Sequence, residues 1–158
     1  MASSAFTTIL LIDHSDKDRT YYADRIKTGL PDSRVLEATD GYSGLELYKT
    51  HHVDCIVSEL YLPDMSGFEL LLEVAQPNIP VIILSDVALN TLAIMAKAYR
   101  AHAFVVKNTS TDLVLTIRRA IARVRFIEKQ RPSLAHAGER AHNPWSHATE
   151  SEGHRLAP

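Results

Sequence analysis

Five short segments of strand character alternate with segments of helical periodicity, and this alternation limits the possible fold more than any other feature of the chain. The strand-like segments cover residues 7–12, 34–39, 55–59, 81–84 and 104–106, and the helical patterns cover about residues 15–28, 40–50, 68–75, 89–100 and 111–129. Segment 7–12 is apolar on both faces, which is typical of a strand buried in a parallel sheet. Five strand–helix repeats predict an α/β domain with helices on both faces of a parallel sheet.

Length and composition indicate one domain followed by a tail. The chain has 158 residues, of which 46% are hydrophobic, and this is enough for one core of ordinary size. We expect this domain to occupy residues 1–130. From Arg131 onward, Pro, Ser, Gly and Glu dominate, and four histidines occur at irregular spacing without an apolar period. Residues 131–158 are therefore predicted to form a disordered polar tail.

Charge and cysteine content restrict the partners and the compartment. The formal net charge of −2 argues against a nucleic-acid partner, and the basic residues within 118–129 are interpreted as a solvated helix face. The single cysteine, Cys55, lies in an apolar run and fits a reducing compartment. The apolar runs are only of strand length, and no signal peptide is readable. We expect a cytoplasmic protein without a membrane segment.

Four polar side chains stand where predicted strands end. Asp13 follows the first strand, Glu59 ends the third, Ser85 follows the fourth and Lys107 follows the fifth. Because the carboxyl ends of parallel strands meet at one edge of a sheet, these four residues are expected to converge on one crevice. Acids can hold a divalent cation, and a hydroxyl and an ammonium can bind phosphoryl oxygens. No Ser/His/Asp or Cys/His arrangement is visible at these ends, so we do not expect an enzyme.

The third strand is followed by the turn Pro63-Asp64-Met65-Ser66-Gly67. With the four strand-end residues, this turn resembles the CheY-like receiver domains of response regulators over residues 7–129. The resemblance implies a flavodoxin-like (βα)5 doubly wound parallel sheet with strand order 2-1-3-4-5, and a role in the phosphorelay signal transduction of two-component systems.

The resemblance also assigns a role to each matching position. Glu59 occupies the phosphoacceptor position, and Ser85, Phe104 and Lys107 occupy the switch and phosphate-binding positions. Asp13, Glu59 and Tyr61 match metal-binding positions. Phe104 has no hydroxyl, and we interpret it as a core residue rather than a switch.

Four residues depart from the family pattern: His14 replaces a second acid, Glu59 the acceptor Asp, Asp86 a small residue and Asn108 a proline. Glu is one methylene longer than Asp, so we expect Glu59 to pair with Lys107, within reach of Ser85, in place of phosphorylation. His14 removes an oxygen ligand, so Mg²⁺ binding is expected to be weak or lost.

The other two departures, Asp86 and Asn108, affect the entrance to the crevice and the backbone after Lys107. Asp86 adds a negative charge that opposes an incoming phosphoryl group. Asn108 removes the usual cause of a cis peptide after Lys107, so a trans bond is expected there.

These features predict an atypical receiver, or pseudo-receiver, that acts through protein–protein interaction without aspartyl phosphorylation. The expected partner is a histidine kinase, an output protein or a second copy, bound through residues 89–129. A purely structural role for Glu59 stays open. A second alternative is a conventional phosphorylatable regulator with another acceptor, such as Asp54 or Asp64. A third is a small-molecule-binding module in the same crevice, although no glycine-rich phosphate loop follows the first strand.

Overall fold

The predicted alternation of strands and helices is present throughout the domain. The computed structural model describes residues 6–74 and 78–138. Its elements follow in the order β1 (Thr7–Ile12), α1 (Asp16–Gly29), β2 (Ser33–Ala38), α2 (Gly41–Thr50), β3 (Cys55–Glu59), α3 (Gly67–Glu73), β4 (Val81–Ser85), α4 (Asn90–Ala98), β5 (Ala103–Val106) and α5 (Leu113–Gly138). Each strand is thus followed by one helix, as expected for a doubly wound α/β domain.

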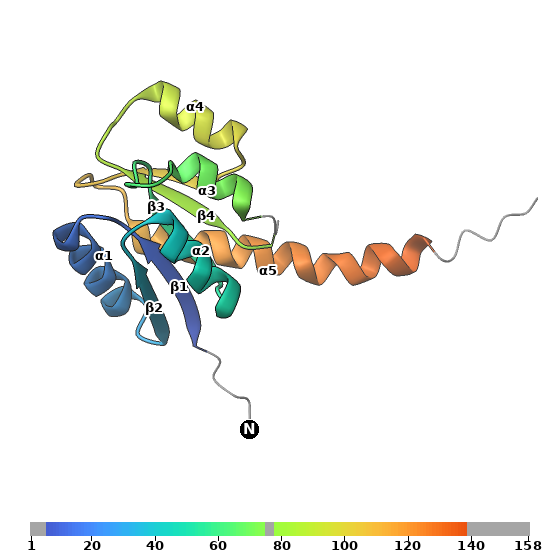
Figure 1. Ribbon diagram of the computed structural model, residues 1–158. Helices are drawn as coiled ribbons and strands as arrows, with labels where there is room; N and C mark the ends of the chain where they lie inside the picture. The colour runs from blue at the N-terminus through green and yellow to red at the C-terminus, as the bar shows by residue number, and fades with distance from the viewer. Residues whose placement is uncertain (1–5, 75–77, 139–158) are drawn as a thin grey trace, which may run out of the picture.

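The five strands form one parallel sheet in the order β2-β1-β3-β4-β5, which confirms the strand order implied by the resemblance. Helices α1 and α5 cover one face of this sheet, and α2, α3 and α4 cover the other (Figure 1). All residues of β3 and β4 are buried. The carboxyl ends of the central strands therefore open onto one edge of the sheet, beneath the loops that lead into the helices.

Alternating side chains of the strands build two separate cores. In β1, Ile9 and Leu11 pack on the side of α1 and α5, whereas Leu10 and Ile12 pack on the side of α2, α3 and α4. This alternation follows from the two-residue period of a strand. Cys55 belongs to the first of these cores and is completely buried, and its burial raises the pKa of its thiol far above the ordinary value.

Helix α5 is longer than the sequence predicts. It was expected to end near Lys129, but it continues to Gly138, so residues 131–138 are helical and not part of a disordered tail. Its first half is docked by buried residues such as Ile117 and Ile121. A docked helix propagates more easily than a new one nucleates, so a polar sequence can extend it. The remaining tail residues, 139–158, lie outside the described part of the chain.

Every helix in the described ranges 6–74 and 78–138 is too short or too polar to span a bilayer.

The turn after β3 is fixed at both of its ends. The two carboxyl oxygens of Asp64 accept hydrogen bonds from the backbone N–H groups of Gly41 and Tyr42, each at 2.8 Å, and so cap the N-terminus of α2. The Gly67 N–H donates to the Leu60 carbonyl at 2.7 Å. A Cβ at Gly67 would lie 2.9 Å from the backbone oxygen of Glu59. The turn therefore holds the end of β3 in place.

We predict that Gly67→Ala destabilises the fold by about 1–3 kcal/mol, because its new methyl group meets backbone that cannot rotate away. Gly41→Ala is a matched control, since Gly41 is also the first residue of its helix. The methyl group there would lie within 2.8 Å of the Met65 side chain, which can rotate away. Urea unfolding of both variants measures the difference, and equal losses would show that the Gly67 contact is not a constraint.

Candidate functional site

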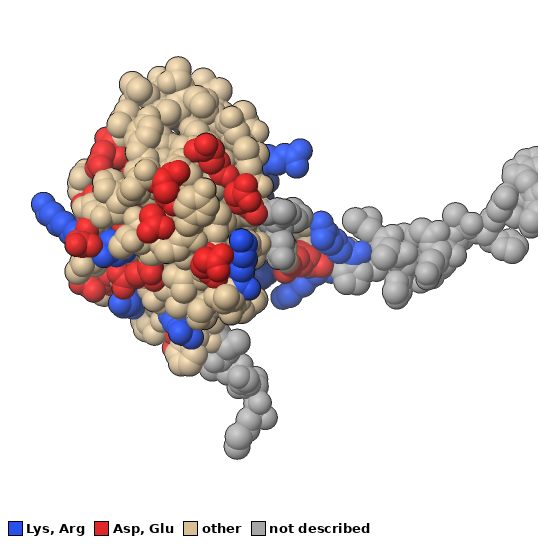
Figure 2. Space-filling view, viewed as in Figure 1, with Lys and Arg blue, Asp and Glu red and all other residues tan. Residues whose placement is uncertain are grey.

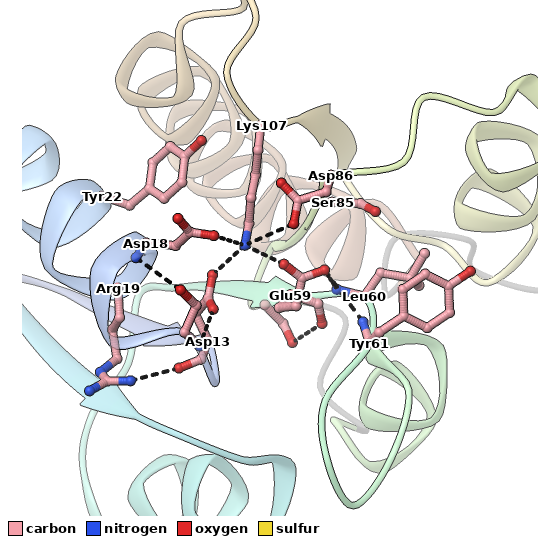
Figure 3. A network of polar contacts seen from close by, with 12 residues as sticks. Asp13, Asp18, Arg19, Tyr22, Glu59, Leu60, Tyr61, Ser85, Asp86 and Lys107 are labelled. Atoms are coloured by element: carbon pink, nitrogen blue, oxygen red, sulfur yellow. Dashed lines mark hydrogen bonds and ion pairs between the residues drawn. The ribbon is translucent and has the colours of Figure 1, made fainter.

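Lys107 lies at the centre of the carboxyl edge of the sheet. It follows β5, its backbone N–H donates to the Ser85 carbonyl at 2.8 Å, and its side chain is almost completely buried. Its Nζ is 2.7 Å from Asp13 Oδ2 and 2.8 Å from Asp18 Oδ2. Nζ also forms an ion pair with Glu59 Oε2, as the sequence predicts, and Asp86 Oδ2 lies farther away at 3.9 Å (Figure 3).

Asp13 and Glu59 are each held by their own backbone surroundings. Asp13 Oδ1 accepts a hydrogen bond from the Ser15 N–H at 2.8 Å. Glu59 Oε1 accepts hydrogen bonds from the N–H groups of Leu60 at 2.8 Å and Tyr61 at 3.4 Å. Each carboxyl group thus binds backbone with one oxygen and Lys107 with the other. The additional methylene of Glu gives it the length to do both.

Asp18 is the site residue that the sequence does not reveal. The pair Ser15 and Asp18 suggests a capping box, but only half of that box forms: the Ser15 hydroxyl accepts a hydrogen bond from the Asp18 N–H at 3.2 Å. The Asp18 carboxyl group binds Lys107 instead of returning to the backbone of Ser15. Lys107 lies 89 positions away in the chain, so local spacing gives no signal for this contact.

The three close carboxyl groups fix the charge of Lys107. Burial lowers the pKa of its ammonium, but the hydrogen bonds to Asp13, Asp18 and Glu59 raise it by more, so the net pKa is raised. An ammonium has three N–H donors, and three carboxyl oxygens are in contact with it. Asp13 and Asp18 accept hydrogen bonds from this ammonium and Glu59 Oε2 forms an ion pair with it, so carboxyl groups of the chain itself surround the cation.

Ser85, Phe104 and Tyr61 do not take part in this cluster through their side chains. The completely buried Ser85 hydroxyl accepts a hydrogen bond from the Val87 N–H at 3.1 Å. Within the described residues this hydroxyl has no hydrogen bond to Glu59, and the role of Ser85 as a switch or phosphate-binding residue stays a prediction. The loop after β4 supplies a nearer partner. Phe104 packs against the core of the α2, α3 and α4 side, and the Tyr61 side chain is exposed.

Asn108 has a left-handed backbone, with φ of 56°, and the bond that joins it to Lys107 is trans, as predicted. Asn tolerates this conformation better than most residues. Its N–H donates to the Tyr22 hydroxyl at 3.3 Å. The backbone after β5 therefore turns through a trans peptide bond and a left-handed Asn108, without a proline.

The donor set does not fit a Mg²⁺ ion in this arrangement. The carboxyl groups of Asp13 and Glu59 face the Lys107 ammonium, and the His14 side chain is exposed. In the described part of the chain, no three His, Cys, Asp or Glu side chains are grouped as they would be around a metal ion. Mg²⁺ requires near-octahedral oxygen ligands. The cluster instead places a single ammonium among the acids.

We predict that Lys107→Met lowers the free energy of unfolding at pH 7 by about 3–5 kcal/mol, because it leaves buried acids without their cation. The pKa of Lys107 is raised on folding, so its stabilisation is complete below the unfolded-chain pKa of about 10.4 and is lost as pH rises through the folded value. The difference in free energy of unfolding between wild type and variant should therefore narrow as the pH rises above about 10.4. Urea unfolding of wild type and variant at pH 7 and at a pH above about 10.4 tests this, with the exposed Lys97→Met as control. A variant as stable as the control would contradict it.

Known proteins share this fold and part of this sequence. The family model of the response regulator receiver domain matches residues 9–118. The chemotaxis protein CheY of Bacillus subtilis is 30% identical over 110 residues, which cover 68% of this chain and 90% of that protein. A response regulator receiver domain protein of Clostridium thermocellum has 26% identity and a TM-score of 0.68, covering 77% of this chain and 98% of that one.

A DNA-binding response regulator of the LuxR family from Staphylococcus aureus has a similar fold, with a TM-score of 0.67 and 24% identity. That match covers 73% of this chain and 98% of the solved one. The family match spans most of the chain, and the strand order of this chain matches that of the similar solved structures. The chain therefore belongs to the family of response-regulator receiver domains of two-component signalling.

Proposed function

We propose that this chain is a pseudo-receiver, which acts in the cytoplasm through protein–protein interaction and without aspartyl phosphorylation or catalysis. The observation that carries the proposal is the state of Lys107, whose ammonium is already in contact with Asp13, Asp18 and Glu59. A phosphoryl group needs free donors to neutralise the charge that develops in its transition state. Here the ammonium already donates to Asp13 and Asp18, and its charge is already paired with Glu59, before any phosphoryl group arrives.

Glu59 itself supports the same function. One of its oxygens accepts backbone N–H groups and the other pairs with Lys107, so its carboxyl group lies against the cation as a phosphoryl group would. Asp86, whose side chain is 65% exposed at the mouth of the crevice, adds negative charge where a donor would enter. We propose that Mg²⁺ binds weakly and that Glu59 holds the domain in one arrangement constitutively.

The conventional alternative finds little support at the other acids. Asp54 precedes β3, at the opposite edge of the sheet from Lys107, and its Oδ2 accepts the Thr8 N–H at 2.8 Å. Both oxygens of Asp64 cap α2. Neither acid has Lys107 beside it to neutralise an acyl phosphate. A small-molecule ligand in the crevice would have to displace the same ion pairs.

The surface of α4 and α5 supports a protein partner. Leu89, Ile94, Met95 and Tyr99 are exposed on or beside α4. In Figure 2 the α4 region forms a mostly uncharged cap at the top of the molecule, whereas acidic side chains gather below it. Exposed apolar patches of this kind mark interaction sites. We propose that residues 89–129 bind a histidine kinase, an output protein or a second copy of this chain.

A direct test is treatment of the natural protein with acetyl phosphate and Mg²⁺, followed by intact mass spectrometry under neutral conditions. We expect no acyl phosphate, and a receiver domain with Asp at the acceptor position serves as the control for the donor. Phosphorylation of Glu59 would refute the proposal. Failure of Glu59→Asp to accept phosphate would not decide the question, because His14 and Asp86 remain in place.

A second test addresses the constitutive arrangement. Glu59→Gln removes the charge that pairs with Lys107 while nearly keeping the shape of the side chain, so we expect amide NMR shifts to spread through residues 89–129. Glu73→Gln, at the exposed end of α3, is the matched control. Shifts confined to the immediate neighbours of residue 59 would mean that Glu59 has only a local structural role.

A further inference from the structure

We infer that Asp18 is a positioning residue that closes the crevice to oxyanions by taking the outermost N–H of Lys107. The inference rests on the proposed function, in which Lys107 is paired with acidic side chains of the chain itself instead of with a phosphoryl group. It goes further because it names a group on α1 that, in addition to Asp86, keeps an incoming anion away from Lys107. Asp18 lies on α1, outside the four strand-end positions that define the crevice.

The exposure of the three acids identifies Asp18 as the outer contact. The side chain of Asp13 is 0% exposed and that of Glu59 is 4% exposed, whereas that of Asp18 is 28% exposed. An anion that approaches from solvent would therefore meet the contact between Asp18 and Lys107 before the two inner pairs. At 2.8 Å from Nζ, the Asp18 oxygen lies where an oxygen of that anion would have to bind.

Helix α1 holds Asp18 in this position by two further contacts. The Asp18 N–H is bound by the Ser15 hydroxyl at the start of the helix. One turn later, the Tyr22 hydroxyl accepts the Asn108 N–H, and residues four apart lie on the same face of a helix. The same face of α1 thus contacts the Lys107 side chain and the residue that follows it. Figure 3 shows Asp18 and Tyr22 on the same side of the Lys107 side chain.

A purely stabilising role for Asp18 makes a different prediction. If Asp18 is removed, Lys107 keeps its contacts with Asp13 and Glu59, so the buried cation stays paired and the fold is maintained. One N–H of the ammonium would then face solvent. A gain of anion binding distinguishes closure of the crevice from simple stabilisation, which would change only the free energy of unfolding.

The test uses inorganic phosphate as the probe and the ¹⁵N shift of the Lys107 ammonium as the readout. We expect Asp18→Ala to bind phosphate at least about tenfold more tightly than wild type, equivalent to about 1.4 kcal/mol. Asp16→Ala is the control, because Asp16 is on the same helix turn and pairs with Arg19 instead of Lys107. Asp18→Asn keeps the shape without the charge and should also bind more tightly than wild type.

Three results would overturn the inference. Unchanged phosphate affinity in both Asp18 variants would show that the residue does not close the crevice. An equal gain in Asp16→Ala would show a general effect of net charge. Phosphate binding by wild type with the affinity of the variants would show that the crevice is already open. None of these results depends on whether Glu59 can be phosphorylated, so they can be distinguished from failure of the proposed function.

Discussion

The carboxyl edge of the sheet depends on the ion pairs and hydrogen bonds of the buried Lys107 ammonium. This ammonium joins the ends of β1, β3 and β5 to the first turn of α1 through Asp13, Glu59 and Asp18. Carboxyl groups gathered at one edge would repel one another in a medium of low dielectric constant. A cation among them turns that repulsion into attraction, and the hydrogen bonds from backbone N–H groups satisfy oxygens that Lys107 does not reach.

The loop after β3 gives this cluster a rigid support. Asp64 joins the loop to the start of α2, and Gly67 lets the backbone approach Glu59 more closely than any residue with a Cβ could. The helix that follows begins with a full capping box between Ser66 and Glu69. The contacts of Gly67 and of the capping box are local in sequence, and the Asp64 contact ties the loop to α2, so Glu59 is positioned by this loop as well as by Lys107.

The sequence predicts the fold well because strand and helix periodicities are local. It also places Asp13, Glu59 and Lys107 together, since parallel strands end at a common edge. It does not reveal the contact of Asp18 with Lys107 or the backbone partner of the Ser85 hydroxyl, because both depend on side-chain direction. Asp18 looks like a cap residue until α1 is packed on the sheet, and the Ser85 hydroxyl turns to the nearest backbone N–H. The sequence also fails to predict the length of α5. The polar composition after Arg131 suggests a tail, but a helix that is already docked on the sheet can continue through polar residues.

The burial of Cys55 has a practical consequence. The chain contains one cysteine, which lies completely buried in the sheet with its thiol held in the protonated form. Thiol reagents act on the exposed thiolate, so the folded protein presents no reactive sulfur of its own. The natural sequence therefore behaves as a cysteine-free background. A fluorophore or spin label attached to a single cysteine introduced on α4 would report from that helix alone.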